Sequence, residues 1–180
     1  MTGRLAKRYA RALFDIAREW NALEAIGEEL GRAVAAFEEP RLRPLCLSPV
    51  LDRATRVRNT KEVVAALHVC DTVRNVVALL AERDRLGILS EIARWYDALL
   101  DGVLGRSRVT IRSAAPLAPA QKQEMVELAR RLTGSREVLA VTEVDAELVG
   151  GVVLEAGGTV YDGSIRAQLN RLSKEMAEGL

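Results

Sequence analysis

The sequence predicts a mainly α-helical fold, in which an N-terminal six-helix antiparallel bundle is followed by a small α/β domain. Apolar residues make up 49% of the 180 residues but aromatic residues only 4%. Ala, Leu and Val must therefore build the core, and these residues suit close helix packing. Apolar residues recur at helical spacing as far as Leu104, whereas the pattern begins to alternate after Gly105. We therefore expect two domains, at residues 1–105 and 106–180.

About six helices with short connections are expected in the first domain, which is the pattern of an antiparallel bundle. Apolar stripes and proline positions place them at residues 4–20, 23–37, 49–67, 70–82 and 86–104, with short helical turns between Pro40 and Pro49. In the 49–67 helix, Ser48 is expected as the N-cap and Pro49 at the first helical position.

The second domain is expected to contain strands, two helices and a hairpin. Residues 106–113 alternate and predict a strand, Pro119 can open a helix that Gly134 ends, and residues 138–144 form a second strand. The pairs Gly150-Gly151 and Gly157-Gly158 bracket an apolar run and predict a β-hairpin. Beyond the hairpin, Asp162, Gly163 and Ser164 can cap a last helix, whose apolar stripe is Ile165, Leu169, Leu172 and Met176.

Composition excludes several classes of protein. Lys and Arg total 26 against 25 Asp and Glu, so the totals indicate no basic face for nucleic acid or anionic lipid. The sequence contains no apolar run of about 20 residues, and the two cysteines, Cys46 and Cys70, are not spaced as a metal pair or redox dithiol. We expect a soluble, intracellular protein with reduced thiols. Its Arg-rich start, Arg4 to Arg11, continues an ordinary helix and is not interpreted as a transit peptide.

Candidate catalytic groups are few. The paired glycines lack the Lys and Ser/Thr of a phosphate loop, Ser164 lies in no nucleophile elbow, and His68 has no partner in a recognisable motif. We therefore predict no catalytic residue, no cofactor-binding residue and no metal ligand. Two alternatives stay open: a small phosphate- or nucleotide-handling enzyme that uses the glycine-rich hairpin and Arg166, and an unrelated helical adaptor.

Several ordered motifs resemble the delta subunit of the rotary ATP synthase, a family called the oligomycin sensitivity conferral protein in mitochondria. Three of them are Tyr9 to Phe14, the Leu47-Ser48-Pro49 corner, and Asn75 to Leu80 followed by Arg85-Leu86. The Ser113-Ala114-x-Pro116-Leu117 joint and the closing signature complete the resemblance. That signature comprises Asp145, Leu148, Gly150, Gly151, Asp162, Gly163, Ser164, Arg166 and Leu169. The chain departs from the family pattern at Val76, Ala118 and Ala146, where Phe, Ser and Pro are more usual.

The resemblance implies a non-catalytic stator subunit of the proton-translocating ATP synthase, which links the catalytic alpha/beta hexamer to the peripheral stalk. It implies that domain 1–105 binds the N-terminal helix of an alpha subunit and that domain 106–180 binds the b subunits. The residues expected to meet the alpha helix are Tyr9, Ala12, Leu13, Val76, Leu79 and Leu80. The protein is then expected at the cytoplasmic face of the bacterial cell membrane, attached only through the complex, with no cofactor.

Overall fold

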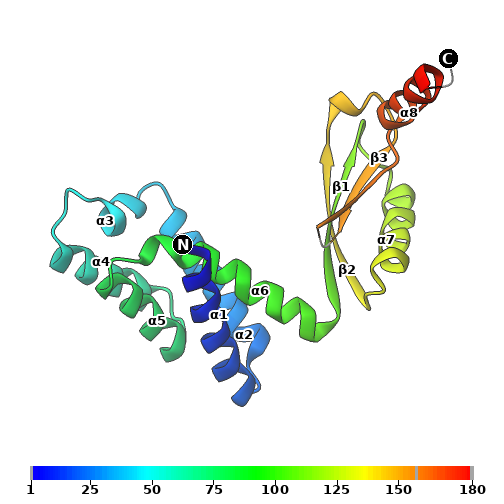
Figure 1. Ribbon diagram of the computed structural model, residues 1–180. Coiled ribbons are helices and arrows are strands. Elements are labelled where there is room, and N and C mark those ends of the chain that lie inside the picture. Colours follow the sequence, from blue (N-terminus) through cyan, green and yellow to red (C-terminus); the bar gives the residue numbers. More distant parts are fainter. Residues whose placement is uncertain (1, 157, 179–180) are drawn as a thin grey trace. The chain divides into compact units, whose positions relative to one another are not determined.

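The computed structural model describes residues 2–156 and 158–178, and the expected residue Gly157 lies outside them. It describes only the backbone at Thr2, Leu172, Lys174, Glu175, Ala177 and Glu178. The chain is mainly helical, as the sequence predicted, and it carries one small mixed sheet (Figure 1). It forms two compact units, Met1–Leu100 and Asp101–Leu180.

The first unit is helical throughout its regular structure. Its elements are α1 (Thr2–Glu19), α2 (Leu23–Glu38), α3 (Arg43–Leu47), α4 (Arg53–Ala66), α5 (Asp71–Glu82), a 3-10 turn (Leu86–Ile88) and the greater part of α6 (Leu89–Leu104). The unit boundary lies within α6, after Leu100, whereas the sequence placed it after this helix.

Tyr96 of α6 joins three helices in the core of the first unit. Its side chain is fully buried, and its hydroxyl donates a hydrogen bond to the carbonyl oxygen of Leu23 at 2.8 Å. Its ring meets that of Phe14 on α1 edge to face, with 5.6 Å between the centroids. Burial raises the pKa of Tyr96 to about 12, so the hydroxyl keeps its proton and remains a donor at neutral pH.

Two helix starts in this unit depend on carboxylates. The sequence prediction that Ser48 caps a helix from Pro49 is wrong: α4 begins at Arg53, and Asp52 accepts a hydrogen bond from the backbone N–H of Thr55 at 3.0 Å. Ser48 instead ends α3. The start of α5 is capped across the fold, because Glu29 of α2 accepts from the N–H of Cys70 at 2.7 Å.

The second unit combines a sheet with two helices. It contains β1 (Arg106–Ser113), α7 (Pro119–Thr133), β2 (Glu137–Val144), a 3-10 turn (Ala146–Leu148), β3 (Val152–Ala156), β4 (Thr159–Asp162) and α8 (Ile165–Glu178). The strand order is β2-β1-β3-β4, with β1 and β2 parallel and the other pairs antiparallel. Gly134 ends α7 at a φ of 66°, as predicted.

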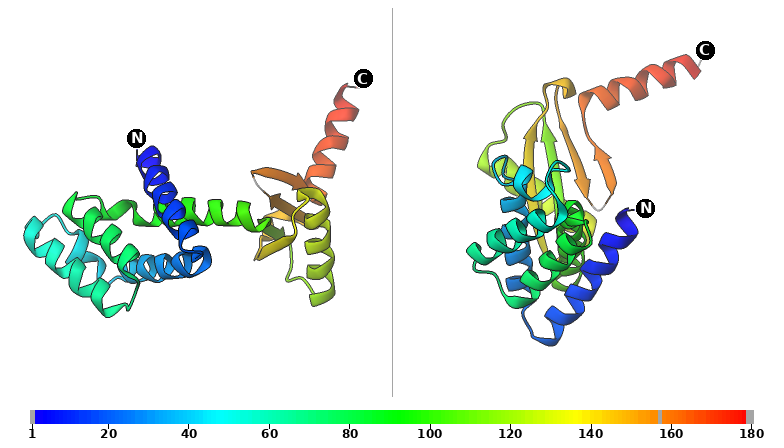
Figure 2. Two further views of the ribbon diagram at one scale, coloured as in Figure 1. Left: turned by 90° about the horizontal axis from the view of Figure 1, so that it is seen from below. Right: turned by 90° about the vertical axis from the view of Figure 1, so that its left-hand side faces the viewer.

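The core of the second unit lies between α7 and one face of the sheet. Its buried residues are Val109, Ile111, Ala129, Leu154 and Ala156. In contrast, α8 leaves the end of β4 and projects from the sheet in both views of Figure 2. The contacts that hold α8 on the sheet must therefore lie at its first residues.

Candidate functional site

A groove of about 850 Å³ runs along the outer side of α1. Leu5, Tyr9 and Ala12 line it, and their spacing of four and three residues places them on one face of the helix. Arg85, which follows α5, also lines the groove. Two of the residues predicted to meet a partner helix, Tyr9 and Ala12, are thus brought together in one open surface.

The other four predicted contact residues do not line this groove. Leu13 and Leu80 are 1% and 0% exposed, so both belong to the core and neither offers surface to a partner. Leu79 is 39% exposed and lines a separate groove between α4 and α5. Val76 is half-buried. The expectation that all six residues share one accessible face therefore needs correction.

The opposite face of α1 packs closely on the unit. Its buried residues are Ala6, Ala10, Leu13, Phe14 and Ala17. Three of these five are alanines, which let neighbouring helices approach. Lys7 adds a contact outside the core, because its ammonium lies 4.9 Å from the centre of the Trp95 ring on α6. The groove is therefore formed on a helix that the bundle core already holds in place.

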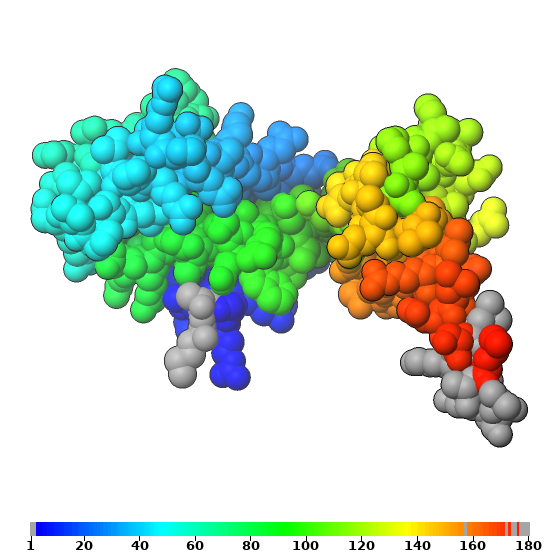
Figure 3. Space-filling view, turned by 90° about the horizontal axis from the view of Figure 1, so that it is seen from above, coloured from blue at the N-terminus to red at the C-terminus, as the bar shows by residue number. Residues whose placement is uncertain are grey.

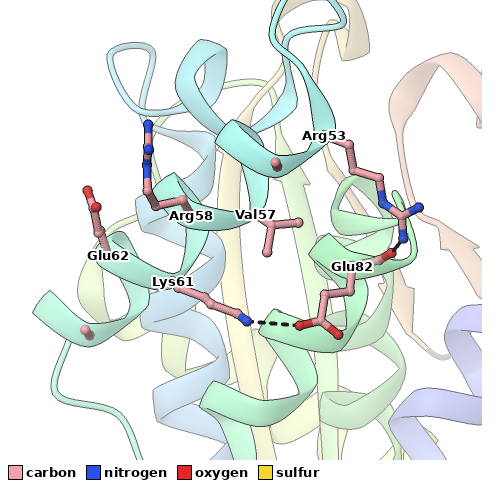
Figure 4. Close-up of a pocket in the computed structure, with 8 residues that line it drawn as sticks. Arg53, Val57, Arg58, Lys61, Glu62 and Glu82 are labelled. Carbon is pink, nitrogen blue, oxygen red and sulfur yellow. Dashed lines mark hydrogen bonds and ion pairs between the residues drawn. The ribbon is translucent and has the colours of Figure 1, made fainter.

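A second groove, of about 810 Å³, lies on the outer face of α4 (Figure 4). The basic residues Arg53, Arg58 and Lys61 line it, and Arg56 lies on the same helix. The structure gives several of them internal partners: Lys61 pairs with Glu82 at 3.0 Å, and Arg53 donates to the carbonyl oxygen of Glu82. Arg56 pairs with Asp84 at 2.9 Å. These cations therefore attach α4 to the end of α5.

The closing signature forms a tight corner at the root of α8. Gly151 has a φ of +85°, and a Cβ there would lie 2.5 Å from the carbonyl oxygen of Gly163 and 2.9 Å from Cα of Ser164. A Cβ on Gly150 would lie 2.6 Å from Cδ1 of Ile165. Gly151 is therefore required by the close approach of the chain before β3 to the start of α8, whereas the contact at Gly150 is with the end of a side chain that can rotate.

Hydrogen bonds complete the corner. The N–H of Ile165 donates to the carbonyl oxygen of Gly150 at 3.0 Å, and the N–H of Gly163 donates to that of Val152 at 3.0 Å. Ser164 is buried and caps α8, since its hydroxyl oxygen accepts from the N–H of Ala167 at 3.1 Å. The backbone of the hairpin thus holds the first turn of α8 directly.

Acidic residues of the signature shape the adjoining turns. Asp162 accepts from the N–H of Ser164 at 2.9 Å, and hydrogen bonds from the Ser164 side chain and backbone lower the pKa of Asp162. Asp145 accepts from the N–H of Glu147 at 3.0 Å. Arg166 approaches Glu147 only to 3.9 Å, and both side chains are largely exposed. Asp162 and Asp145 therefore fix backbone turns, while Arg166 contributes a loose surface pair.

The apolar stripe of α8 has no cover within the described chain. Ile165, Leu169 and Met176 are 45%, 58% and 73% exposed, and the first two follow one another at a spacing of four residues. Figure 3 shows the described side chains of this helix, in orange and red, at the surface. An amphipathic helix that leaves its apolar residues exposed is a candidate surface for another protein.

No constellation for catalysis is found among the described residues, and no three His, Cys, Asp or Glu side chains in that part gather as metal ligands. His68 is exposed at the end of α4. Burial raises the pKa of Cys46, and burial together with Glu29 raises that of Cys70, so both thiols are poor nucleophiles.

The geometry of the hairpin does not suit the alternative of a phosphate-handling enzyme. The N–H of Gly150 is directed at the carbonyl oxygen of Leu148, at 2.6 Å, and the space beside Gly151 is taken by the carbonyl oxygen of Gly163. A phosphate needs free N–H groups, and it is repelled by a carbonyl oxygen. The first glycine pair therefore serves chain packing.

Sequence reasoning noted the Arg-rich start of the chain, Arg4 to Arg11, but did not connect its positive charge with a binding groove. Arg4, Lys7, Arg8, Arg11 and Arg85 all line it, and within the part of the chain that the structure describes Asp15 is the one acidic side chain there. The balanced totals concealed this arrangement. The available signal was the recurrence of Arg at positions 4, 8 and 11, which are neighbours along one side of a helix.

Three comparisons relate the chain to known proteins. A family model described as ATP synthase delta (OSCP) subunit matches residues 5–176. The ATP synthase subunit delta of Syntrophus aciditrophicus (strain SB) is 35% identical, covering 98% of this chain and 97% of the relative. That of Myxococcus xanthus (strain DK1622) is 37% identical, covering 97% of each. A chain in the cryo-EM structure of the Toxoplasma gondii mitochondrial ATP synthase hexamer shares the fold, with a TM-score of 0.74, 22% identity, and 96% and 97% coverage.

Proposed function

We propose that the chain links the catalytic alpha/beta hexamer to the b-subunit stalk, because it belongs to the ATP synthase delta (OSCP) family. It is therefore a non-catalytic component of the peripheral stalk. Torque from the central rotor would otherwise turn the hexamer. A link of this kind needs two adhesive surfaces and stiff connections, and it needs no catalytic group.

We propose that the two parts of the chain divide this task. Residues 1–105, with α1 to α6 acting as a six-helix antiparallel bundle, hold the catalytic head, and residues 106–180 hold the stalk. The division into compact units at Leu100 and Asp101 supports separate functions. The open α1 groove lies in the first unit, and the exposed stripe of α8 lies in the second.

The groove along α1 is the observation that supports the contact with the head. We propose that the N-terminal helix of an alpha subunit lays its apolar stripe on Tyr9 and Ala12, in the manner of an amphipathic helix in a groove. Leu13 lies beneath this surface in the core, whereas Val76, Leu79 and Leu80 of α5 do not line the groove.

For the stalk contact, we propose that α8 supplies the apolar surface on which the b subunits pack. The exposed Ile165 and Leu169 support the proposal, as does the glycine corner that roots this helix on the sheet. Asp145, Gly150, Gly151, Asp162, Gly163, Ser164 and Arg166 then act mainly by orienting α8.

The proposed location is the cytoplasmic face of the bacterial cell membrane, where the protein is peripheral and reaches the membrane only through the complex. The bacterial relatives support this proposal. In the described part of the chain, no helix is long and apolar enough to cross a bilayer.

Calorimetric titration of the full chain with an alpha-subunit N-terminal peptide tests the head contact. Ala12→Trp fills the groove and should weaken binding at least tenfold without unfolding the chain. Ala35→Trp is the matched control, because Ala35 is exposed on α2 and lies outside the groove. Equal affinity of the two variants for the peptide would refute the assignment of the groove.

A further inference from the structure

The α1 groove combines an apolar floor with a rim of uncompensated positive charge. Arg4, Arg8, Arg11 and Arg85 line it, and all four side chains are exposed. Among the described residues, none of these arginines forms an ion pair with a carboxylate. This differs from the α4 face, whose cations Lys61 and Arg56 have internal acidic partners.

The positions of the charges give the groove a direction. Three arginines lie at intervals of four and three residues along α1: Arg4, Arg8 and Arg11. Asp15 comes four residues after the last of them. At a rise of about 1.5 Å per residue, the three arginines span roughly 10 Å, or two helical turns. Asp15 therefore places an acidic group at the end of the groove nearest the C-terminus of α1.

We propose that this rim selects an amphipathic partner helix whose apolar stripe is flanked by carboxylates over two turns and followed by a basic residue opposite Asp15. The inference rests on the proposed function, because it defines the chemistry of the helix that docks beside Tyr9 and Ala12. Complementary charge fixes the register and the direction in which the helix lies.

An amphipathic protein helix fits these observations better than a lipid surface. The floor of Leu5, Tyr9 and Ala12 is one helical stripe wide, and the first two side chains are already half-buried. A bilayer-bound helix would need a broad exposed apolar face, whereas the apolar face of α1 is committed to the core through Leu13 and Phe14.

Exposed ion pairs are individually weak, so the rim acts through several pairs together. Each pair is expected to change affinity by less than about fivefold, and salt should screen it. Replacing two arginines by glutamates reverses their charge, so that attraction to the carboxylates of the partner helix becomes repulsion. This has a larger effect on affinity than removing the two charges. We expect Arg8→Glu with Arg11→Glu to weaken binding of an acidic helix by at least about tenfold at low salt.

The test uses the full chain and two designed peptides with identical apolar stripes. One peptide carries Glu on its flanks at intervals of four and three residues, and the other carries Lys at the same positions. The wild-type chain should bind the Glu peptide at least about tenfold more tightly than the Lys peptide near 50 mM salt, and the preference should shrink near 500 mM. The Arg8→Glu, Arg11→Glu variant, whose groove has as many carboxylates as cations, should abolish it.

Arg41→Glu with Arg43→Glu is the control, because it changes the net charge equally at exposed positions outside the groove. It should keep the wild-type preference, and circular dichroism verifies that both variants fold. Equal binding of the Glu and Lys peptides overturns the inference, as does binding of anionic phosphatidylserine vesicles in place of either peptide.

The alpha-subunit peptide, titrated in parallel, separates the two proposals. If this peptide binds without salt dependence, only the charge inference fails. If it does not bind, the proposed head contact fails.

Discussion

Replacing Gly151 by Ala tests whether the glycine corner is a steric requirement. The added Cβ would lie 2.5 Å from the carbonyl oxygen of Gly163 and 2.9 Å from Cα of Ser164, and both are backbone atoms that cannot rotate away. An L-residue at this positive φ costs about 1–2 kcal/mol. The overpacking adds about 1–3 kcal/mol. We therefore expect Gly151→Ala to destabilise the second unit by about 2–5 kcal/mol.

The chain offers a matched control at Gly158. Its φ of +83° is almost the same as that of Gly151, but a Cβ there meets no atom within 4 Å. Gly158→Ala should therefore cost only the conformational part, about 1–2 kcal/mol. The difference between the two variants isolates the contact with the root of α8.

Urea unfolding of the full chain can assign the loss to one unit. Both tryptophans, Trp20 and Trp95, lie in the first unit, so their fluorescence reports that unit, while circular dichroism reports both. The Gly151→Ala variant should show an earlier dichroism transition and an unchanged fluorescence midpoint. If it is no less stable than Gly158→Ala, the close approach at the corner does not constrain the chain. A lower urea midpoint of the tryptophan-fluorescence transition would show that the units do not unfold independently.

Three further outcomes are expected. Tyr96→Phe leaves the carbonyl of Leu23 without its buried donor and should lower the free energy of unfolding of the first unit by about 1–3 kcal/mol, measured by urea titration of tryptophan fluorescence. Glu29→Ala removes the cap on the Cys70 N–H and should cost about 0.5–2 kcal/mol in the same assay, with Glu29→Gln restoring part of it. Because the pKa of Asp162 is lowered from its usual 3.8, its carboxylate stabilises the start of α8 above that pH, and this contribution is lost as the pH falls through the folded-state pKa. NMR titration of the α8 amides should show the transition, and Asp162→Asn should abolish it.

Local signals predicted most of the secondary structure because they act within a few residues. Gly134 ends α7 and Ser164 caps α8 as expected, since each effect involves one turn of backbone. The start of α4 was misplaced because two residues could serve as its cap. Ser48 ends α3, and its hydroxyl oxygen accepts from the N–H of Val50 at 3.3 Å, whereas Asp52 accepts from the N–H of Thr55 and caps α4.

The candidate site was predicted less completely, because helical spacing does not tell which side of a helix its neighbours cover. Ala12 and Leu13 are adjacent and differ by about 100° around α1, yet Ala12 faces the groove and Leu13 is 1% exposed. The same limit applies to Glu29, which accepts a hydrogen bond from the N–H of Cys70, 41 residues later in the chain, at the start of α5. Such contacts follow from tertiary packing and leave no short-range pattern.

The two proposed contacts make different physical demands on the chain. At the root of α8, backbone groups meet directly: Ile165 donates to Gly150, and Gly163 donates to Val152, both at 3.0 Å. Such contacts resist bending better than the pair of Arg166 with Glu147, which is 3.9 Å apart and exposed to solvent. The α1 groove, by contrast, presents separate cations on a helix already fixed by its core. Lateral load on a stalk-binding α8 would therefore be carried by the glycine corner, while charge at the groove decides which helix docks and in which direction.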